Sequence, residues 1–380
     1  MGSSVEEATS DTVSESERPL GVGIVGVGKI SEQYLATLPE LPNLRLVAVA
    51  DLNEARAAEV AAEHGVVSVP VEELLTHPDV DVVLNLTIPA AHVEVATKAL
   101  NAGKHVFGEK PLALAPEEAV DMLRLAEERG LRVGSAPDTV LGTGVQTARR
   151  LLDDGAIGTP VGATAFWAAP GHELWHPAPA FYYQPGGGPL FDMGPYYLTA
   201  LVTLLGPVVR VSGSATRSTR ARSVGSGPLA GTALEVNIDT HVTALLEHAS
   251  GVASSVTVSF EVWGSRHPLI EVYGTDGTIS VPDPNRFGDP VEILTREDRE
   301  WREVPASAGY EGAARGYGLA DMAHAIATGR EHRASGALAF HVLEIMDAVV
   351  RAGHEHRVID IESTVERPDA VPEGARPETW

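Results

Sequence analysis

The stretch at residues 21–34, GVGIVGVGKISEQY, contains one glycine pattern twice, and this pattern restricts the fold more than any other feature of the chain. The literal G-x-G-x-x-G copy begins at Gly21, and a second copy begins at Gly26 with Ser31 in place of its last glycine. Such a turn binds a pyrophosphate where it follows a buried strand and opens a helix, because the helix N-terminus supplies unpaired N–H groups. The residues around each copy therefore decide which one forms the turn.

The second copy has the better surroundings for a phosphate-binding turn. Polar residues (SESERPL) precede the first copy, whereas residues 22–25 precede the second and have the apolar character of a strand. Apolar residues then follow Gly28 at helical spacing as far as Leu38. We therefore expect Gly26 and Gly28 to form the turn, with Ser31 small enough to keep the helix close to the strand.

An acidic residue follows at the position where a dinucleotide site needs one. Residues 44–50 are expected to form a second strand, and Asp51 ends it 23 positions after Gly28 (51 minus 28). A carboxylate about 20 residues beyond the turn accepts hydrogen bonds from the adenosine ribose and repels a 2′-phosphate. Leu52 and Asn53 offer no cation for that phosphate, so NAD is favoured over NADP. Asp51 could also cap the helix that begins near Asn53, which is compatible with this role.

Strands and helices continue to alternate as far as residue 135. Strands are expected at 80–86, 104–107 and 131–135, and helices at 91–101 and 116–129. This alternation predicts a parallel, doubly wound sheet that binds its ligand at the carboxyl ends of the strands. The same rim is then expected to hold Thr87, Pro89, His92, Glu109 and Lys110.

Composition limits the other possibilities. A chain of 380 residues is long enough for two domains, since single cores stop growing near roughly 250–300 residues. The formal net charge of −24 opposes a nucleic acid as partner, because binding to phosphates needs an excess of Lys and Arg. The absence of cysteine excludes thiolate chemistry and Cys-built metal sites and fits a reducing, cytoplasmic location. No apolar run is long enough for a membrane helix, and residues 1–18 are expected to be a disordered tail.

Four sequence blocks give the chain a resemblance to a known family. GVGKIS, LTIPAAH, GKHVFGEKP and GGGPLFDMGPYYLTAL (residues 186–201) resemble blocks of the Gfo/Idh/MocA oxidoreductases, the family of glucose–fructose oxidoreductase and inositol dehydrogenase. The resemblance covers about residues 20–360. It implies a nicotinamide-dependent enzyme that acts on a sugar, glycoside or cyclitol.

The last block departs from the family's usual G-G-G-x-x-x-D-x-G-x-H-x-x-D. Asp192 matches the first aspartate, whereas Tyr196 stands at the histidine position and Thr199 at that of the final aspartate. A tyrosine recurs here in branches resembling glucose–fructose oxidoreductase and dihydrodiol dehydrogenase. The resemblance therefore implies an active enzyme with Tyr in place of the usual His, without the lysine, aspartate and histidine arrangement of the inositol type.

The resemblance implies catalytic roles for Lys110, Tyr196 and Asp192. Hydride transfer from an alcohol needs a group that takes the hydroxyl proton. Tyr196 would be this acid–base group, its phenolate favoured by the ammonium of Lys110, which would act as electrostatic partner and proton relay. Asp192 would either bind substrate hydroxyls or hold Lys110. The cofactor-binding residues expected are Gly26, Gly28, Lys29, Ile30, Asp51, Thr87, Pro89, His92, Glu109 and Lys110.

The loop at residues 171–183, GHELWHPAPAFYY, is rich in aromatic residues and imidazoles. Aromatic rings stack on the C–H face of sugars and imidazoles bind hydroxyls, which predicts a sugar or cyclitol pocket. The alternative is a proline-stiffened loop that buries its own rings. No metal is expected, because prolines break any helix that would pair His172 with His176 and no third ligand is apparent. The substrate-binding residues expected are Asp138, His172, Trp175, His176, Tyr183, Asp192 and Tyr196.

From about Thr159 the pattern changes to segments that alternate with period two, which indicates an antiparallel or mixed sheet with one open face. Strands are expected at 160–166, 208–214, 236–247, 251–262, 269–273 and 278–281, and helices at 195–205 (with Asp192 as N-cap), 315–328 and 337–352. The resemblance implies that the open sheet forms the interface of a homodimer or homotetramer.

The expected fold class is thus α/β, with an N-terminal Rossmann doubly wound parallel sheet and a C-terminal α+β domain containing a large, open, mostly antiparallel sheet. The expected divisions are a disordered tail (1–18), an NAD-binding domain (19–137), a substrate-binding and oligomerisation domain (138–358) and a C-terminal strap or tail (359–380).

Three functions remain in competition. The first is an NAD-dependent dehydrogenase or reductase that acts on a ring hydroxyl or the corresponding ketone. The second is a lyase or glycosidase that retains NAD and works through transient ring oxidation, which needs the same residues. The third is a regulator that binds a sugar or nucleotide without turnover, and the presence of both Lys110 and Tyr196 counts against it.

Overall fold

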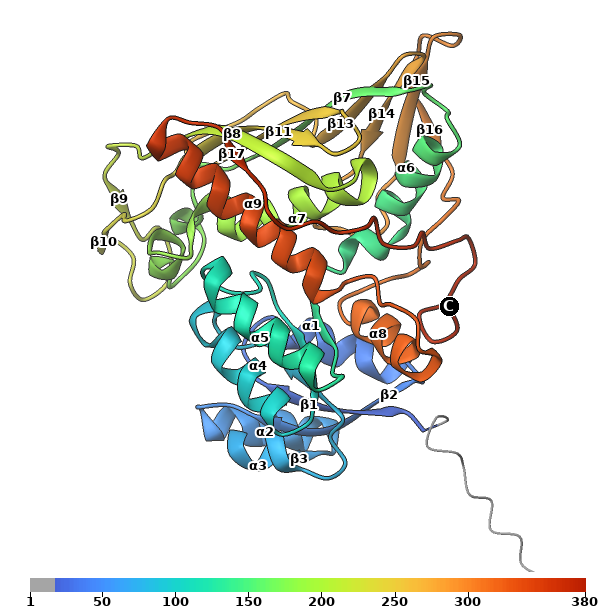
Figure 1. Ribbon diagram of the computed structural model, residues 1–380. Helices are drawn as coiled ribbons and strands as arrows, with labels where there is room; N and C mark the ends of the chain where they lie inside the picture. The colour runs from blue at the N-terminus through green and yellow to red at the C-terminus, as the bar shows by residue number, and fades with distance from the viewer. Residues whose placement is uncertain (1–17) are drawn as a thin grey trace, which may run out of the picture.

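The computed structural model describes residues 18–380, which form two lobes (Figure 1). The predicted tail lies outside the described residues except for Arg18, whose guanidinium donates two hydrogen bonds to Asp81 (2.7 and 2.6 Å). The lobe drawn in blue and cyan contains the first sheet, and the other lobe contains a larger sheet covered by helices.

The first lobe is a six-stranded, fully parallel sheet with strand order β3-β2-β1-β4-β5-β6. Its strands are β1 (Leu20–Val25), β2 (Leu44–Ala50), β3 (Val67–Ser68), β4 (Val82–Asn85), β5 (His105–Gly108) and β6 (Val133–Ser135). Its helices are α1 (Ser31–Thr37), α2 (Glu54–His64), α3 (Val71–Thr76), α4 (His92–Asn101) and α5 (Pro116–Glu128). The order reverses at β1, and this confirms the predicted doubly wound sheet.

The second lobe contains a nine-stranded sheet with order β16-β15-β14-β13-β7-β12-β11-β8-β17. Its strands are β7 (Pro160–Ala168), β8 (Val208–Thr216), β11 (His241–His248), β12 (Ala253–Ser259), β13 (Ile270–Gly274), β14 (Gly277–Val281), β15 (Val291–Thr295), β16 (Arg302–Val304) and β17 (Ile359–Asp360). Only β7 and β12 pair in parallel, so the predicted large, mostly antiparallel sheet is confirmed.

The strands of the second lobe differ from prediction at several points. The segment predicted at 236–247 becomes a strand only from His241, because the backbone N–H of Asn237 donates instead to the carbonyl of Tyr183 in the aromatic loop (2.8 Å). The period-two pattern did not reveal β3, β15, β16, β17, α3, α6 (Thr143–Asp153) or the small pair β9 (Arg222–Ser223) and β10 (Ala233–Leu234). Most of these elements are short, and an alternating pattern needs about four or more residues to be recognised.

The long helix α7 (Gly188–Leu205) packs against β11 and β12 of the large sheet and corrects one prediction. It starts at Gly188, with Gly187 as N-cap and Pro189 in the first turn, so Asp192 lies inside the helix and does not cap it. Proline is well tolerated in a first turn, where no N–H partner is needed. Pro195, which was expected to start the helix, lies within it. The carboxylate of Asp192 is therefore free to meet groups outside the helix.

One face of the large sheet is covered by α7 and by α9 (Gly336–Glu355). Side chains of β11 alternate along the strand, with Val242, Ala244 and Leu246 buried and Thr243, Leu245 and Glu247 exposed. The second face is thus open to solvent in the single chain, as the alternation predicted.

The C-terminal segment runs back along the molecule from β17 to α8 (Tyr317–Thr328), as Figure 1 shows. The side chain of Val371 is fully buried, and its N–H donates to Gln146 Oε1 (2.9 Å). Helix α8 contributes Leu319 and Met322 to the core of the first lobe. We propose divisions at 19–137 and 138–358 in chain order, with α8 packed on the first lobe in space and residues 359–380 as a strap.

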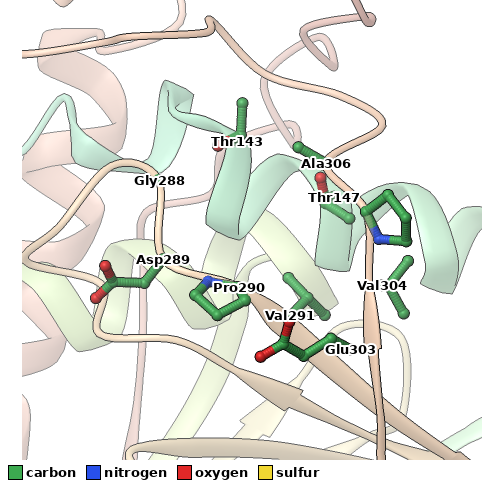
Figure 2. A pocket seen from close by; sticks show the side chains of 10 residues that line it. Thr143, Thr147, Gly288, Asp289, Pro290, Val291, Glu303, Val304 and Ala306 are labelled. Carbon is green, nitrogen blue, oxygen red and sulfur yellow. The ribbon is translucent and has the colours of Figure 1, made fainter.

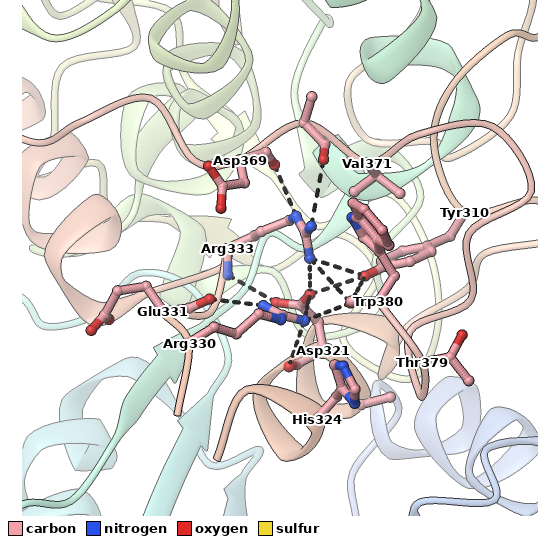
Figure 3. Close-up of polar contacts among 12 residues, drawn as sticks. Tyr310, Asp321, His324, Arg330, Glu331, Arg333, Asp369, Val371, Thr379 and Trp380 are labelled. Atoms are coloured by element: carbon pink, nitrogen blue, oxygen red, sulfur yellow. Dashed lines mark hydrogen bonds and ion pairs between the residues drawn. The ribbon is translucent and has the colours of Figure 1, made fainter. Parts of the chain in front are cut away.

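A buried carboxylate ties α8 to this strap (Figure 3). Asp321 has no exposed surface and accepts hydrogen bonds from Arg330 (2.8 Å), from the Tyr310 hydroxyl (2.9 Å) and from the side chain of Arg333. Arg330 also donates to the backbone oxygen of Trp380 (2.6 Å). Burial alone would raise the pKa of Asp321, but the two guanidinium groups outweigh it and hold the pKa below its ordinary value.

We expect Asp321→Asn to lower the free energy of unfolding by about 3–5 kcal/mol near neutral pH, because it leaves a buried guanidinium unpaired. A lowered pKa stabilises the fold above the ordinary pKa of an aspartate and loses this contribution as the pH falls. The difference between wild type and variant should therefore shrink below about pH 4. Urea unfolding at a series of pH values measures this difference in the free energy of unfolding. The variant Asp298→Asn, at an exposed position, is the control. A variant as stable as wild type at neutral pH would contradict the expectation.

Candidate functional site

The first two glycines of the doubled motif serve the packing of β1 and not a ligand. A Cβ at Gly21 would overlap the carbonyl oxygen of Asp79, and a Cβ at Gly23 would lie 2.7 Å from Leu74 Cδ2. Both positions lie in a fully enclosed strand, as expected from the context of the motif. The literal glycine pattern is therefore a consequence of close packing in the sheet.

The second copy forms the turn at the carboxyl end of β1. Gly26 has φ of 96°, and a Cβ there would come within 2.7 Å of the Leu86 backbone, so only glycine fits. At Gly28 a Cβ would meet no atom within 4 Å, which leaves open space above the turn. Ser31 is buried and its hydroxyl donates to the Gly28 carbonyl (2.7 Å), which holds the turn against α1. This open, glycine-lined turn fits a pyrophosphate.

The carboxylate of Asp51 lies beside the same turn. It accepts hydrogen bonds from the backbone N–H groups of Val27 and Asn53, both at 2.8 Å. The cap of α2 is Asn53, whose side chain accepts from the N–H of Arg56 (3.2 Å), so Asp51 is not needed as a cap. A carboxylate has about four acceptor positions, so both oxygens can still accept from ribose hydroxyls.

His92 joins the loops that follow β4 and β5. Its side chain is buried, with Nδ1 2.7 Å from the Pro111 carbonyl oxygen and Nε2 3.0 Å from that of Thr87. Asn85, at the end of β4, donates to the His92 carbonyl (2.9 Å) and accepts from the Thr87 hydroxyl (2.6 Å). Both ring nitrogens face backbone oxygens, so the contact of His92 with the cofactor, which stays a prediction, would not use them. His92 instead positions the two rim loops.

Lys110 and Asp192 form an ion pair where the two lobes meet. The ammonium donates to Asp192 Oδ1 (2.9 Å) and to the Asp192 backbone carbonyl (2.7 Å), and it lies 5.2 Å from the ring centroid of Tyr196. Burial would lower the pKa of Lys110, but Asp192, Tyr196 and Glu109 together raise it. Burial would raise the pKa of Asp192, but Lys110 and His172 lower it strongly. Both groups are therefore charged, and Asp192 holds Lys110 in place.

His172 continues this polar chain into the aromatic loop. Its Nε2 lies 2.8 Å from Asp192 Oδ2, and its Nδ1 lies 3.2 Å from the indole Nε1 of Trp175. An indole N–H can only donate, so Nδ1 accepts and the hydrogen on Nε2 is donated to Asp192. The ring of Trp175 is 59% exposed and packs against His176. Trp175 and His176 are thus presented to solvent beside the ion pair.

Two of the residues predicted to contact the substrate are buried against protein groups. Tyr183 is fully buried and its hydroxyl donates to the Glu173 carboxylate, so this ring packs the loop from inside. Asp138 is also fully buried and accepts from the N–H groups of Gly316 and Gly318, both at 3.0 Å. Burial raises the pKa of Asp138. Both side chains therefore stabilise loops, and the alternative of a loop that buries its own rings holds for Tyr183.

A buried arginine anchors the aromatic loop, and sequence reasoning missed it. Arg222 Nη1 lies 2.6 Å from Glu173 Oε1, and its Nη2 lies 2.6 Å from Glu261 Oε1. Glu173 follows His172 directly, so this network sets the position of the imidazole. Arg222 lies in β9, far along the chain, and its sequence surroundings carry no signal for this role.

Tyr196 is buried in α7, with 5% of its surface exposed. Its hydroxyl oxygen accepts a hydrogen bond from Arg315 Nη2 (3.0 Å), a second contact that the sequence did not indicate. Burial raises the pKa of Tyr196, and the opposing charges of Lys110 and Arg315 do not cancel this effect. The phenolate expected from the sequence is therefore not the resting form, and the phenol is protonated.

Two surface hollows lie away from these residues. One of about 440 Å³ lies between α6 and β16 and is lined by Thr143, Thr147, Asp289 and Glu303 among others (Figure 2). The other, of about 500 Å³, lies beside Arg330 and Trp380. Neither includes a predicted site residue. Across residues 18–380 no helix is both long and apolar enough to span a bilayer, and no cluster of three His, Asp or Glu side chains could hold a metal ion.

A dinucleotide-binding sheet whose rim meets a buried lysine from its own loop and an aspartate from a second lobe defines a nicotinamide-dependent oxidoreductase. Comparison with known proteins agrees with this class. Residues 20–136 match the oxidoreductase family with an NAD-binding Rossmann fold, and residues 145–280 match the GFO/IDH/MocA C-terminal domain. The chain belongs to the Gfo/Idh/MocA family of NAD-binding oxidoreductases.

Individual relatives act on sugars. The chain is 31% identical to dTDP-3,4-didehydro-2,6-dideoxy-alpha-D-glucose 3-reductase of Streptomyces violaceoruber, over 90% of this chain and 97% of the reductase. It is 26% identical to D-xylose dehydrogenase of Paenarthrobacter nicotinovorans, over 81% and 85% of the two chains. Its fold is similar to levoglucosan dehydrogenase in complex with NADH and L-sorbose (TM-score 0.77, 24% identity, 91% of this chain and 100% of that one).

Proposed function

We propose that the protein transfers a hydride between a nicotinamide cofactor and a secondary hydroxyl or ketone of a sugar, glycoside or cyclitol. The observation that carries this proposal is the Lys110–Asp192 ion pair, which lies against the ring of Tyr196 at the rim of the dinucleotide-binding sheet. The names of the relatives support a carbohydrate as the substrate class.

We further propose that the chain belongs to a branch with Tyr196 in place of the usual histidine. When bound, the nicotinamide would supply or accept the hydride. The protonated phenol of Tyr196 would donate its proton to the oxygen of a ketone, and in the opposite direction the same oxygen would take the hydroxyl proton. The permanent charge of Lys110 would stabilise the developing alkoxide, since its raised pKa disfavours a role as proton relay.

For substrate binding we propose the exposed side of the aromatic loop. Trp175 offers a ring face to the C–H side of a sugar, and His176 and Asp192 offer polar groups to its hydroxyls. His172 would act mainly by orienting Asp192, because both of its nitrogens have protein partners.

The residues at the turn fit NAD. The proposed cofactor contacts are Gly26, Gly28, Lys29, Ile30, Asp51, Thr87, Pro89, Glu109 and Lys110. Space above Gly28 admits the pyrophosphate, and the Asp51 carboxylate would accept from the ribose hydroxyls. Glu109 is buried and accepts from the Tyr34 hydroxyl (2.9 Å), so it would act chiefly by holding the loop that presents Lys110.

We expect Asp51→Ala to reduce the preference for NADH over NADPH by about tenfold or more, because it removes an acceptor for the ribose and a repulsion of the 2′-phosphate. Dissociation constants of both cofactors, from fluorescence titration, measure the change without any substrate. Asp121→Asn, on the exposed face of α5, should leave both constants unchanged. A wild-type preference for NADPH would show that Asp51 does not select the cofactor.

A panel of monosaccharides, glycosides and inositols, each with NAD, tests the function itself. Steady formation of NADH with one or more of them is the expected result. Turnover of a substrate without net NADH would favour the lyase or glycosidase that works through transient oxidation. Tight binding of a sugar with neither reaction would favour a regulator.

We also propose that the open face of the large sheet is the contact surface of a homodimer or homotetramer. The face around Thr243, Leu245 and Glu247 is solvent-exposed in the single chain, which suits pairing with a second copy. Light scattering tests this proposal. The cytoplasmic location stays a prediction.

A further inference from the structure

Arg315 is a buried cation at the junction of the two lobes. Its side chain is 7% exposed and lies on the segment that leads into α8. Its Nη2 donates to the Tyr196 hydroxyl oxygen (3.0 Å) and to Asn285 Oδ1 (2.9 Å), which belongs to the loop after β14. The guanidinium carbon lies 5.3 Å from the centroid of the Tyr196 ring. Arg315 thus contacts the proposed acid–base group more directly than Lys110 does.

The chemistry of the guanidinium sets the direction of this hydrogen bond. A guanidinium has donors and no acceptor, so the oxygen of Tyr196 must accept. Within residues 18–380 this is the hydroxyl's only hydrogen bond, so its own hydrogen is not used by the protein. The hydroxyl of the next residue, Tyr197, is buried and has no hydrogen-bond partner among the described residues. Burial and the negative charge of Asp283 raise its pKa. The two neighbouring phenols therefore differ in their hydrogen bonding: Tyr196 accepts from a guanidinium and Tyr197 does not.

Asp138, which follows β6, lies beside Arg315. One carboxylate oxygen accepts from the N–H groups of Gly316 and Gly318, and the other lies 3.5 Å from Arg315 Nη1. A Cβ at Gly318 would lie 2.6 Å from the Asp138 Cβ, so this close approach needs glycine. The backbone that follows Arg315 is thus held by Asp138. The contact of Arg315 Nη1 with Asp138 is too long for a hydrogen bond.

We infer that Arg315 is a positioning residue that makes the Tyr196 oxygen an acceptor, leaves its hydrogen free for a substrate oxygen, and stabilises the phenolate formed when that hydrogen is transferred. This inference rests on the proposed function, in which Tyr196 is the acid–base group. It adds a second cation to Lys110 at the same phenol, and each acts on a different part of it: the guanidinium on the oxygen and the ammonium on the ring face.

The charges around Tyr196 show in which direction Arg315 changes the pKa of the phenol. Lys110 and Arg315 lower the pKa of the phenol, whereas burial, Glu109 and Asp192 raise it. Removing the guanidinium charge must raise the pKa further, because the phenolate loses a stabilising cation. Arg315→Lys keeps the charge but not the planar donor geometry, and Arg315→Gln keeps a donor without the charge.

Kinetics of ketone reduction separate these variants. We expect Arg315→Gln to lower kcat by about tenfold or more with little change in KM, and Arg315→Lys to restore part of the loss. The alkaline limb of the pH profile, where the phenol loses its proton, should move up by about one pH unit in Arg315→Gln. In a Tyr196→Phe background the same substitution should cause no further loss. The inference would be overturned if Arg315→Gln lowered kcat equally in the wild-type and Tyr196→Phe proteins. It would also be overturned if the alkaline limb of the pH profile did not move in Arg315→Gln.

A second measurement needs no substrate, so it tests the contact between Arg315 and Tyr196 even if the proposed function is wrong. Tyrosines labelled with ¹³C at Cζ are observed by NMR, and the Tyr196 signal is assigned by its loss in Tyr196→Phe. Arg315→Gln should shift this signal and leave that of Tyr197 in place, whereas Arg302→Gln on the exposed strand β16 should move neither. A Tyr196 signal that is unchanged in Arg315→Gln, while the protein stays folded, would exclude the contact.

Discussion

Lys110→Ala should reduce kcat for hydride transfer by about 10³-fold or more while NADH still binds. The substitution removes the ammonium that faces Asp192 and Tyr196, so an alkoxide would develop without this nearby charge. It also leaves the buried carboxylate of Asp192 with His172 as its remaining side-chain partner. Turnover with the best substrate of the panel, together with NADH titration by fluorescence, separates the loss of chemistry from a loss of cofactor binding.

The control for this variant is another lysine next to the same strand. Lys104 lies at the amino end of β5, whereas Lys110 lies beyond its carboxyl end. The ammonium of Lys104 donates to the His77 carbonyl (3.0 Å), so Lys104→Ala should keep full activity. The position of Lys110 at the carboxyl end of β5 is then what distinguishes the two. A Lys110→Ala enzyme within tenfold of wild type would remove this residue from the mechanism.

Tyr196→Phe should lower kcat by roughly 10²- to 10⁴-fold, because it deletes the hydroxyl that gives or takes the proton at the substrate oxygen. The raised pKa of the phenol keeps it protonated at neutral pH, so reduction of a ketone should be fast at neutral pH and slow as the phenol ionises. Oxidation of the alcohol should show the opposite trend and accelerate as the pH rises. Both limbs should disappear from the pH profile of the variant.

Tyr197→Phe is the matched control for this substitution on the same helix. Its hydroxyl is buried without a hydrogen-bond partner, so its removal should cost little activity and little stability. Measuring kcat for both variants with one substrate gives the comparison. A larger loss from Tyr197→Phe than from Tyr196→Phe would mean that the two tyrosines have been assigned the wrong way round.

Local sequence features predicted which residues lie at the rim of the first sheet. The register of the doubled glycine motif followed from the apolar residues before Gly26, and the structure shows the reason: Gly21 and Gly23 pack inside β1. Asp51 was found by its spacing from the turn, and Lys110 by its place at the end of β5. Parallel strands bring all such positions to one rim, so a local pattern predicts their neighbourhood.

Residue type alone did not predict which side chains would be exposed. Asp138, Tyr183 and His92 have groups suited to bind a ligand, yet each is buried with protein partners. Asp192 was expected as a helix cap and instead lies inside α7, because a Gly-Pro start was not recognised as the beginning of the helix. No local pattern indicates the burial of the first three side chains, because it depends on how separate segments of the chain pack together.

The sequence by itself determined the class of fold, the parallel, doubly wound character of the first sheet and the residues that meet at its rim, because strands and helices of regular period pack in few ways. Only the tertiary structure decided that Arg315 contacts Tyr196 and that Arg222 anchors the loop of His172. Their partners lie far away along the chain, and such contacts depend on how loops fold over the rim, which no local period encodes. The protonation of the Tyr196 phenol also depended on the tertiary structure. Its pKa is set by burial and by charged groups that come from several elements.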